Sequence, residues 1–159
     1  MEYVNILPDS SAERDERYMR MAVTAAEESA ARGEVPVGCV IVRGDEILAV
    51  TSNRREENRD ATSHAELDAI SEACRKLGGW RLLGCELFVT LEPCPMCAGA
   101  IVNSRIPRVV IGAKDAKAGA LGSVVNLCAY PLNHKPAVVF GVLADECADV
   151  LRRFFKGRR

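Results

Sequence analysis

The amino-acid sequence predicts an α/β protein in which helices are layered on a sheet. Two observations carry this prediction: segments with strand-like and helix-like hydrophobic patterns alternate along the chain, and short connectors separate them. With 159 residues and no repeat, low-complexity run or linker, the chain suits one compact domain. We therefore expect residues 1–159 to form a single domain, with residues 1–12 as a flexible N-terminal extension.

The first predicted elements are a helix and a pair of strands. Residues 13–32 have helical periodicity, and Gly33 is expected to end this helix. Residues 37–42 and 47–52 are predicted strands joined by a turn at 43–46. The residues expected to share one face of the helix are Tyr18, Met21, Ala22 and Ala25.

The remaining elements continue the alternation. A helix is predicted over residues 64–77, with Gly78 and Gly79 after it. Its inward-facing residues are expected to be Leu67, Ile70, Cys74 and Leu77. The elements predicted after it are a strand at 86–90, a helix at 95–103, strands at 108–113 and near 137–140, and a last helix at 144–156.

Four residues carry the clearest chemical signal, namely His64 and Glu66, followed by Cys94 and Cys97. His64 and the two cysteines are zinc ligands by type, whereas Glu66 need not bind a metal. A structural Zn²⁺ is normally held by four protein groups, but a catalytic one keeps a position open for water. Three ligands beside a spare carboxylate therefore indicate hydrolytic chemistry, with Glu66 as the general base.

The spacing of the cysteines fits the start of a helix. Cys94 and Cys97 stand three residues apart, which places both sulfurs on one helical face, and Pro93 and Pro95 suit a helix entry. The partial positive charge of a helix N-terminus favours thiolates, the form that binds metal. Because His64 also precedes a predicted helix, we expect two helix starts to converge on one ion.

Each part of this cluster also has a simpler interpretation. Ser63 and Glu66 fit the capping-box pattern S-x-x-E, and a lone Cys-x-x-Cys fits a redox dithiol or half of a structural zinc site. The joint occurrence favours catalytic zinc, because the redox interpretation leaves His64 without a role and the capping interpretation leaves the cysteines without one. A fourth ligand would restore the structural interpretation; the candidates are Cys39, Cys85, Cys128 and His134.

The motifs resemble a known family. His-Ala-Glu at 64–66 with Pro-Cys-Pro-Met-Cys at 93–97 is similar to the signature of zinc nucleoside and nucleobase deaminases. A colinear series from about Tyr18 to the C-terminus resembles the bacterial tRNA-specific adenosine deaminases within that superfamily. The series includes Glu-Val-Pro-Val-Gly at 34–38, Asn53, Thr-Leu-Glu-Pro at 90–93, Ala-Gly-Ala-Ile at 98–101, Lys-Asp-Ala-Lys at 114–117, Asn-His at 133–134 and Phe-Phe at 154–155.

The resemblance implies a specific fold, cofactor and reaction. The fold would be a three-layer α/β/α sandwich with a five-stranded mixed sheet, of the cytidine-deaminase type. Each subunit of a homodimer would bind one Zn²⁺ and deaminate the wobble adenosine of a tRNA anticodon stem-loop to inosine, with Glu66 moving the protons. Departures from the family pattern are Ala61, Ser63 and Lys135.

The resemblance also assigns substrate contacts, each with an ordinary alternative. Asn53 would read the base but also suits a turn, and Val37 would pack on the base but also suits the core. Asp115 would lie near the substrate backbone, although a solvated loop charge is the default. Further expected tRNA contacts are Lys114, Lys117, Arg152, Arg153 and Lys156.

The charge and the cysteine content narrow the expected cellular location and binding partners of the protein. The formal net charge is −1, from 21 basic and 22 acidic residues, so no overall basic footprint marks nucleic-acid binding. Five of the last eight residues are basic, which suits either phosphate contact or the dipole of a helix C-terminus. Seven cysteines, including the apolar-face residues Cys39, Cys74 and Cys147, indicate free thiols. With no signal-peptide pattern or long apolar run, we expect a cytoplasmic protein without membrane contact.

Two alternative functions remain open from sequence alone. One is a guanine, cytosine or nucleoside deaminase of the same superfamily. The other is a non-catalytic, zinc-stabilised RNA-binding module, which would need a fourth protein ligand and would tolerate loss of Glu66.

Overall fold

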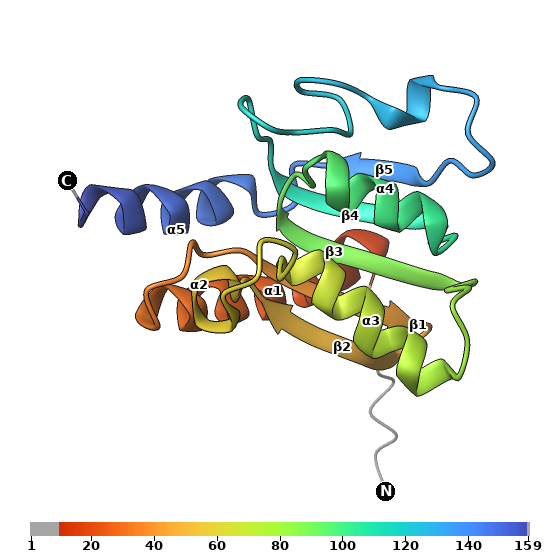
Figure 1. The fold of residues 1–159 in the computed structure, drawn as a ribbon, viewed down its shortest axis with the longest axis horizontal. Helices are drawn as coiled ribbons and strands as arrows, with labels where there is room; N and C mark the ends of the chain where they lie inside the picture. Colours follow the sequence, from red (N-terminus) through yellow and green to blue (C-terminus); the bar gives the residue numbers. More distant parts are fainter. Residues whose placement is uncertain (1–9, 159) are drawn as a thin grey trace, which may run out of the picture.

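A computed structural model describes residues 10–158 as one five-stranded sheet with helices on both faces (Figure 1). The strands are β1 (Gly38–Arg43), β2 (Glu46–Ser52), β3 (Cys85–Leu91), β4 (Arg108–Ala113) and β5 (Ala137–Phe140). The helices are α1 (Ser11–Ala31), α2 (Arg55–Asn58), α3 (Ala65–Leu77), α4 (Pro95–Asn103) and α5 (Ala144–Lys156), with a 3₁₀ turn η1 (Leu127–Ala129). The predicted three-layer α/β/α sandwich is confirmed.

The sheet is mixed, and its strand order is β2-β1-β3-β4-β5. β1 is antiparallel to both β2 and β3, whereas β3, β4 and β5 run parallel to one another. The chain passes from β3 to β4 through α4, and from β4 to β5 through residues 114–136. In such sheets, ligands bind beyond the carboxyl ends of the parallel strands, here residues 91–94 and 113–118.

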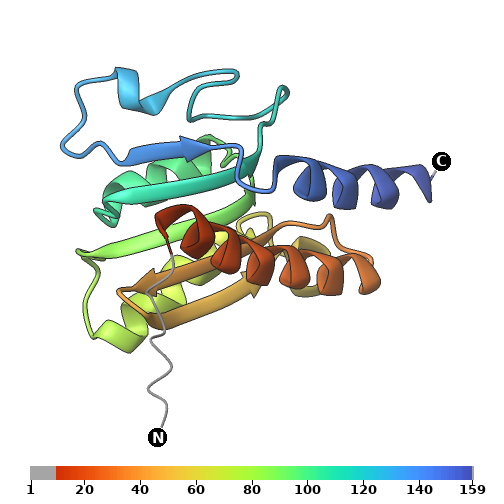
Figure 2. The same cartoon turned by 180° about the vertical axis from the view of Figure 1, so that it is seen from behind.

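Two apolar clusters attach the helices to the sheet. On one face, side chains of α3 and α4 pack against the sheet through residues such as Ile41, Leu87 and Ile101. On the other face, α1 and α5 pack on Val40, Phe88 and Val110 (Figure 2). Valine and isoleucine suit these strands because branched side chains fill a surface that is buried on both faces.

The face that α3 turns inward agrees with the prediction in part, because Ile70, Cys74 and Leu77 pack against the core but alanines lie closest to the sheet. Its buried apolar residues are Ala65, Ala69 and Ala73, whereas Leu67, Ile70, Cys74 and Leu77 are only partly buried. Residues spaced by four share one helical face, and alanines there allow the helix to lie close to the sheet. In α1, similarly, Met19 is fully buried and Met21 only partly.

The start of α1 is also earlier than predicted. Ser10 caps the helix: its hydroxyl accepts from Glu13 N, and the Glu13 carboxylate accepts from Ser10 N. Residues 10–12 therefore belong to the cap and first turn of α1 and not to a flexible extension. Residues 1–9 lie outside the described residues.

An ion-pair network holds the sheet together where β3 and β4 begin, at the end away from the carboxyl ends of these strands. The Arg108 guanidinium lies 2.7 Å from both Asp15 Oδ2 of α1 and Glu86 Oε2 of β3. Arg14 adds a contact of 2.8 Å to the other Glu86 oxygen.

Among the described helices, none has the length and apolar character needed to cross a bilayer.

Candidate metal centre and substrate pocket

Three metal-ligating side chains converge at the N-terminal ends of α3 and α4. His64 is the N-cap residue of α3, Cys94 is the N-cap residue of α4, and Cys97 lies in the first turn of α4. His64 Nδ1 is 3.7 Å from Cys94 Sγ and 3.5 Å from Cys97 Sγ. Among residues 10–158, no other group of three or more His, Cys, Asp or Glu side chains comes this close together.

These separations fit zinc. Zn–S bonds of roughly 2.3 Å and Zn–N bonds of roughly 2.05 Å at a tetrahedral angle place sulfur about 3.6 Å from nitrogen. The two observed sulfur–nitrogen distances, 3.7 and 3.5 Å, lie on either side of this value. Two thiols and one imidazole also form a typical donor set for zinc.

The four candidates for an additional ligand do not join the cluster. His134 Nε2 lies 2.6 Å from the carbonyl oxygen of Ile106. The Cys85 and Cys128 thiols contact the carbonyl oxygens of Leu83 and Pro136, and Cys39 is buried in the apolar core. Within the part of the chain that the structure describes, the site thus offers three protein ligands, one fewer than a closed structural zinc site has.

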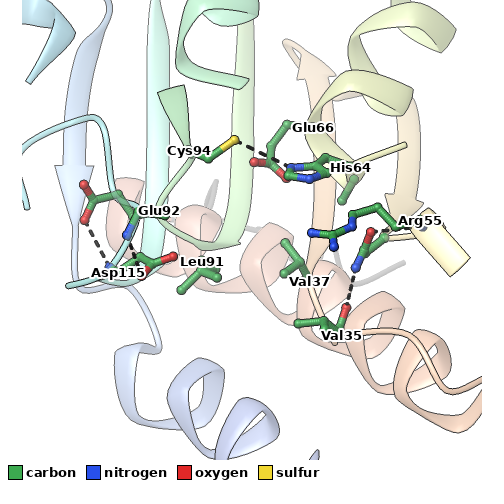
Figure 3. A pocket seen from close by; sticks show the side chains of 12 residues that line it. Val35, Val37, Arg55, His64, Glu66, Leu91, Glu92, Cys94 and Asp115 are labelled. Carbon is green, nitrogen blue, oxygen red and sulfur yellow. Dashed lines mark hydrogen bonds between the residues drawn. The ribbon is translucent and has the colours of Figure 1, made fainter. Parts of the chain in front are cut away.

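Glu66 is buried beside the three ligands, with 4% of its surface exposed. Burial raises the pKa of its carboxyl group, while its own backbone N–H, the Cys97 side chain and the charge of His64 act in the opposite direction. The alternative interpretation, a capping box between Ser63 and Glu66, does not apply, because the N-cap residue of α3 is His64 and the Ser63 hydroxyl donates to Asp68. The Glu66 carboxylate is therefore available to the pocket (Figure 3).

The start of α4 favours a thiolate at Cys94. A hydrogen bond from the Cys97 side chain lowers the pKa of Cys94 to about 5, and the backbone N–H groups of Cys97 and Met96 and the charge of His64 act in the same direction. Partial burial opposes this shift. The Cys97 side chain, together with the backbone N–H groups at the start of α4, thus favours the charged form of Cys94 that metals bind.

A pocket of about 200 Å³ opens at the metal-ligating cluster. Its walls come from the segments before β1 and after β2 and from the ends of β3 and β4, and Glu66 lies at its inner end (Figure 3). The lining residues are Val35, Val37, Asn53, Arg55, His64, Ala65, Glu66, Leu91, Glu92, Cys94, Asp115 and Ala118. A space of this size suits one flat ring system better than a large cofactor.

The structure brings the three expected substrate residues into this pocket. Asn53 also has the turn role: its Nδ2 donates to Val35 O at 3.2 Å, and its Oδ1 accepts from Arg55 N at 3.3 Å. The Asp115 Oδ1 atom accepts from the backbone N–H groups of Lys117 and Ala118, which leaves Oδ2 without a hydrogen bond in the described chain. Val37 is partly buried, so it serves both the core and the pocket wall.

The expected tRNA contacts lie outside the pocket. Lys114 and Lys117 are exposed on the loop after β4, and Arg152, Arg153 and Lys156 are exposed on α5. Arg153 forms ion pairs with Asp149 at 2.9 Å and with Glu27 at 3.7 Å, so part of its charge is already compensated.

Two charged pocket residues were not predicted from the sequence. Arg55 points into the pocket, and its guanidinium has no side-chain partner within residues 10–158 (Figure 3). No pattern distinguishes it from the other basic residues of this segment. Glu92 is buried on the opposite wall, and its position two residues before Cys94 in the Thr-Leu-Glu-Pro-Cys motif was the available signal.

Comparison with known proteins places these features in context. Residues 12–113 match the family model of the cytidine and deoxycytidylate deaminase zinc-binding region. The tRNA-specific adenosine deaminase of Bacillus subtilis (strain 168) is 48% identical over 147 residues, which cover 92% of this chain and 91% of that protein.

Solved structures show the same fold. One, from a study of A-to-I editing by tRNA:A34 deaminases at the wobble position of transfer RNA, has a TM-score of 0.83 and 43% identity, covering 85% of this chain and 99% of that chain. A guanine deaminase from Nitrosomonas europaea has a TM-score of 0.73 and 26% identity, covering 87% of this chain and 83% of that one.

Proposed function

The chain belongs to the cytidine and deoxycytidylate deaminase family, and from this premise we propose that it converts the wobble adenosine of a tRNA anticodon to inosine. The reaction consumes one water and releases one ammonia. The observation that carries the chemistry is the buried Glu66 carboxylate beside a three-ligand zinc site in a pocket of base size. The choice of substrate is supported by the 48% identical relative, which is named a tRNA-specific adenosine deaminase.

The residues of this chain have separate tasks in the reaction. His64, Cys94 and Cys97 would hold one zinc ion per chain, which would supply the Lewis acidity that activates a water for attack on C6 of adenine. Glu66 accepts the two protons of that water in turn and delivers one to the ring nitrogen and one to the departing amino group.

The remaining pocket residues position the base. Val37 packs on the ring, and Asn53 offers the second N–H of its amide to a ring edge, because the first is bound to Val35 O. Asp115 lies on the opposite side of the pocket from Arg55, and its free Oδ2 accepts a hydrogen bond from the sugar of the flipped nucleotide or from the neighbouring nucleotide. Removal of the base from the stack is compensated by these contacts and by the flanking nucleotides.

Exposed cations supply the phosphate contacts. Arg55 reaches the pocket mouth without a side-chain partner among the described residues, so its charge is free for a phosphate. The wider surface contacts proposed are Lys114, Lys117, Arg152, Arg153 and Lys156. Seven free cysteines and a tRNA substrate support a location in the cytoplasm.

We further propose that the enzyme is a homodimer. Large apolar side chains are exposed at the start of α4 and along the segment after β4, namely Met96, Val124, Val125, Tyr130 and Leu132. Such a group of exposed apolar residues is typical of an interface. Sedimentation equilibrium of the zinc-loaded protein should give twice the mass of the chain, and a monomer at micromolar concentration would contradict the assignment.

A substrate comparison tests the proposed function. Inosine formation on an anticodon stem-loop with a wobble adenosine is compared with ammonia release from free guanine, cytosine, cytidine and adenosine, all with zinc-loaded enzyme. We expect efficient turnover on the stem-loop and little on the free compounds. Turnover of guanine without any turnover of the stem-loop would favour the alternative function, a guanine deaminase. The guanine deaminase from Nitrosomonas europaea, 26% identical, is the reason for including guanine.

A further inference from the structure

Glu92 is a buried carboxylate at the end of β3 that is bound by four protein donors. Only 2% of the residue is exposed. Its Oε1 accepts from Asp115 N at 3.2 Å and from the Ser123 hydroxyl. Its Oε2 accepts from Leu121 N at 3.2 Å and from Ser123 N at 3.1 Å. Among residues 10–158, no lysine or arginine side chain is paired with it, so hydrogen bonds alone compensate its burial.

All four donors belong to one segment, residues 115–123, which follows β4. Gly119 of this segment packs directly on the carboxylate, because a Cβ atom there would lie 2.3 Å from Glu92 Oε2. The segment also donates from Ala120 N to Pro93 O at 2.9 Å, next to Glu92. The segment is therefore folded around the carboxylate and joined to the residues that lead to Cys94.

The same segment supplies one wall of the pocket. Asp115 and Ala118 line the pocket, and Asp115 lies across it from Arg55 (Figure 3). The Asp115 backbone N–H that binds Glu92 belongs to the residue whose side chain shapes this wall. The position of Asp115 in the pocket thus depends on a side chain that is anchored in β3.

We propose that Glu92 is a positioning residue, whose carboxylate holds residues 115–123 as the substrate-binding wall of the pocket. It acts through Asp115 and not on the reacting atoms. The substrate in this inference rests on the proposed function, whereas the role in organising the segment does not.

A carboxylate is the side chain that this arrangement requires. It offers acceptor positions only, and four donors face it here. A glutamine of the same shape would direct its NH₂ group at two of these donors. The Ser123 hydroxyl can turn and accept, but a backbone N–H cannot, so Glu92→Gln leaves at least the N–H of Asp115 or of Leu121 without a partner.

The test combines kinetics with hydrogen exchange. In Glu92→Gln we expect KM for the stem-loop to rise about ten-fold with kcat changed less than about three-fold, as when an interaction that serves binding alone is removed. Amide exchange in residues 115–123 should become faster, and zinc content should remain one per chain. The matched control is Asp15→Asn, which alters a buried carboxylate at the other end of the sheet and should lower the melting temperature without changing KM or exchange at 115–123.

The outcomes separate the inference from the proposed function. Wild-type KM together with wild-type exchange at 115–123 in Glu92→Gln overturns the positioning role, and so does loss of zinc with unchanged exchange. If Glu92→Gln does not fold, Ser123→Ala removes one donor and should still accelerate exchange in this segment; unchanged exchange there overturns the role. If the wild-type enzyme does not act on the stem-loop, the proposed function fails, and the exchange data alone decide the role of Glu92.

Discussion

At the scale of single residues, the Glu66 carboxylate is the group on which the chemistry depends. It is buried against the metal ligands but is absent from the three-residue ligand set, and it forms no capping box with Ser63. A carboxylate in this position is free to transfer protons. Its removal should therefore affect turnover more than metal binding.

Glu66→Ala should keep about one zinc per chain and a normal melting temperature but lose about three orders of magnitude in turnover. The measurements are metal analysis, thermal denaturation and inosine formation. Glu46→Ala, at an exposed glutamate at the start of β2, is the control and should turn over like the wild type. Wild-type turnover in zinc-loaded Glu66→Ala would contradict the catalytic role of Glu66 and would favour the alternative of a non-catalytic RNA-binding module.

Replacement of a cysteine ligand should affect zinc and stability together. In Cys94→Ala or Cys97→Ala, zinc content should fall well below one per chain and the melting temperature should fall by on the order of 10 °C, because metal binding contributes to folding. Cys74→Ala, at a partly buried thiol outside the ligand set, is the control. Full zinc content in both ligand variants would show that the metal binds elsewhere.

The sequence predicted the metal-ligating residues because residue type and spacing carry that information locally. His64 and Cys94 each stand at a helix start, where local patterns are strong. The environment of Glu92 could not be predicted in this way, because its donors lie 23 to 31 residues further along the chain. Arg55 was missed for a related reason: only the fold shows which basic residue of its segment faces the pocket.

At the scale of elements, boundaries were predictable where glycine or a capping residue marks them. α3 ends at Gly78, which has a φ of 70°, and α4 and α5 begin at the predicted residues. The short elements α2 and η1 were missed, since four and three residues are too few to show periodicity. The inward face of α3 was predicted only in part: Ile70, Cys74 and Leu77 pack against the core, but the residues closest to the sheet are alanines, because small side chains let the helix approach.

α5 is the element proposed to hold tRNA through charge. Changing Arg152, Arg153, Lys156, Arg158 and Arg159 to Gln should weaken stem-loop binding and reduce the slope of log K against log salt by roughly 0.7–0.9 for each phosphate that is no longer neutralised. The total should be smaller than five phosphates imply, because Arg153 is already paired with Asp149 and Glu27. Binding measured at several salt concentrations provides the slope.

Gln replacements of Arg75 and Lys76, exposed near the end of α3, are the control for a general loss of charge. We expect them to leave the slope nearly unchanged. Equal slopes for the α5 variant and the wild type would mean that these cations only complement the end of the helix.

At the scale of the whole molecule, stability and substrate binding are separated along the strands. The Asp15, Glu86 and Arg108 network lies where β3 and β4 begin, and the pocket lies where they end. Asp15→Asn should lower the free energy of unfolding by about 2 kcal/mol, because Arg108 loses a charged partner in a mostly buried pair. Urea denaturation of the zinc-loaded protein measures this change, and an unchanged midpoint would contradict it.

The position of α5 has a practical consequence for joining this protein to another. Phe154 and Arg158, near its end, line a hollow with Gly33 and Glu34 that shares Val35, Asn53 and Arg55 with the walls of the substrate pocket. A partner or affinity tag fused closely after Arg159 would therefore crowd the approach of a folded RNA. α1, in contrast, begins beside the Arg14 and Glu86 ion pair at the far end of the sheet. A tag joined directly before Ser10 would leave the approach to the pocket open.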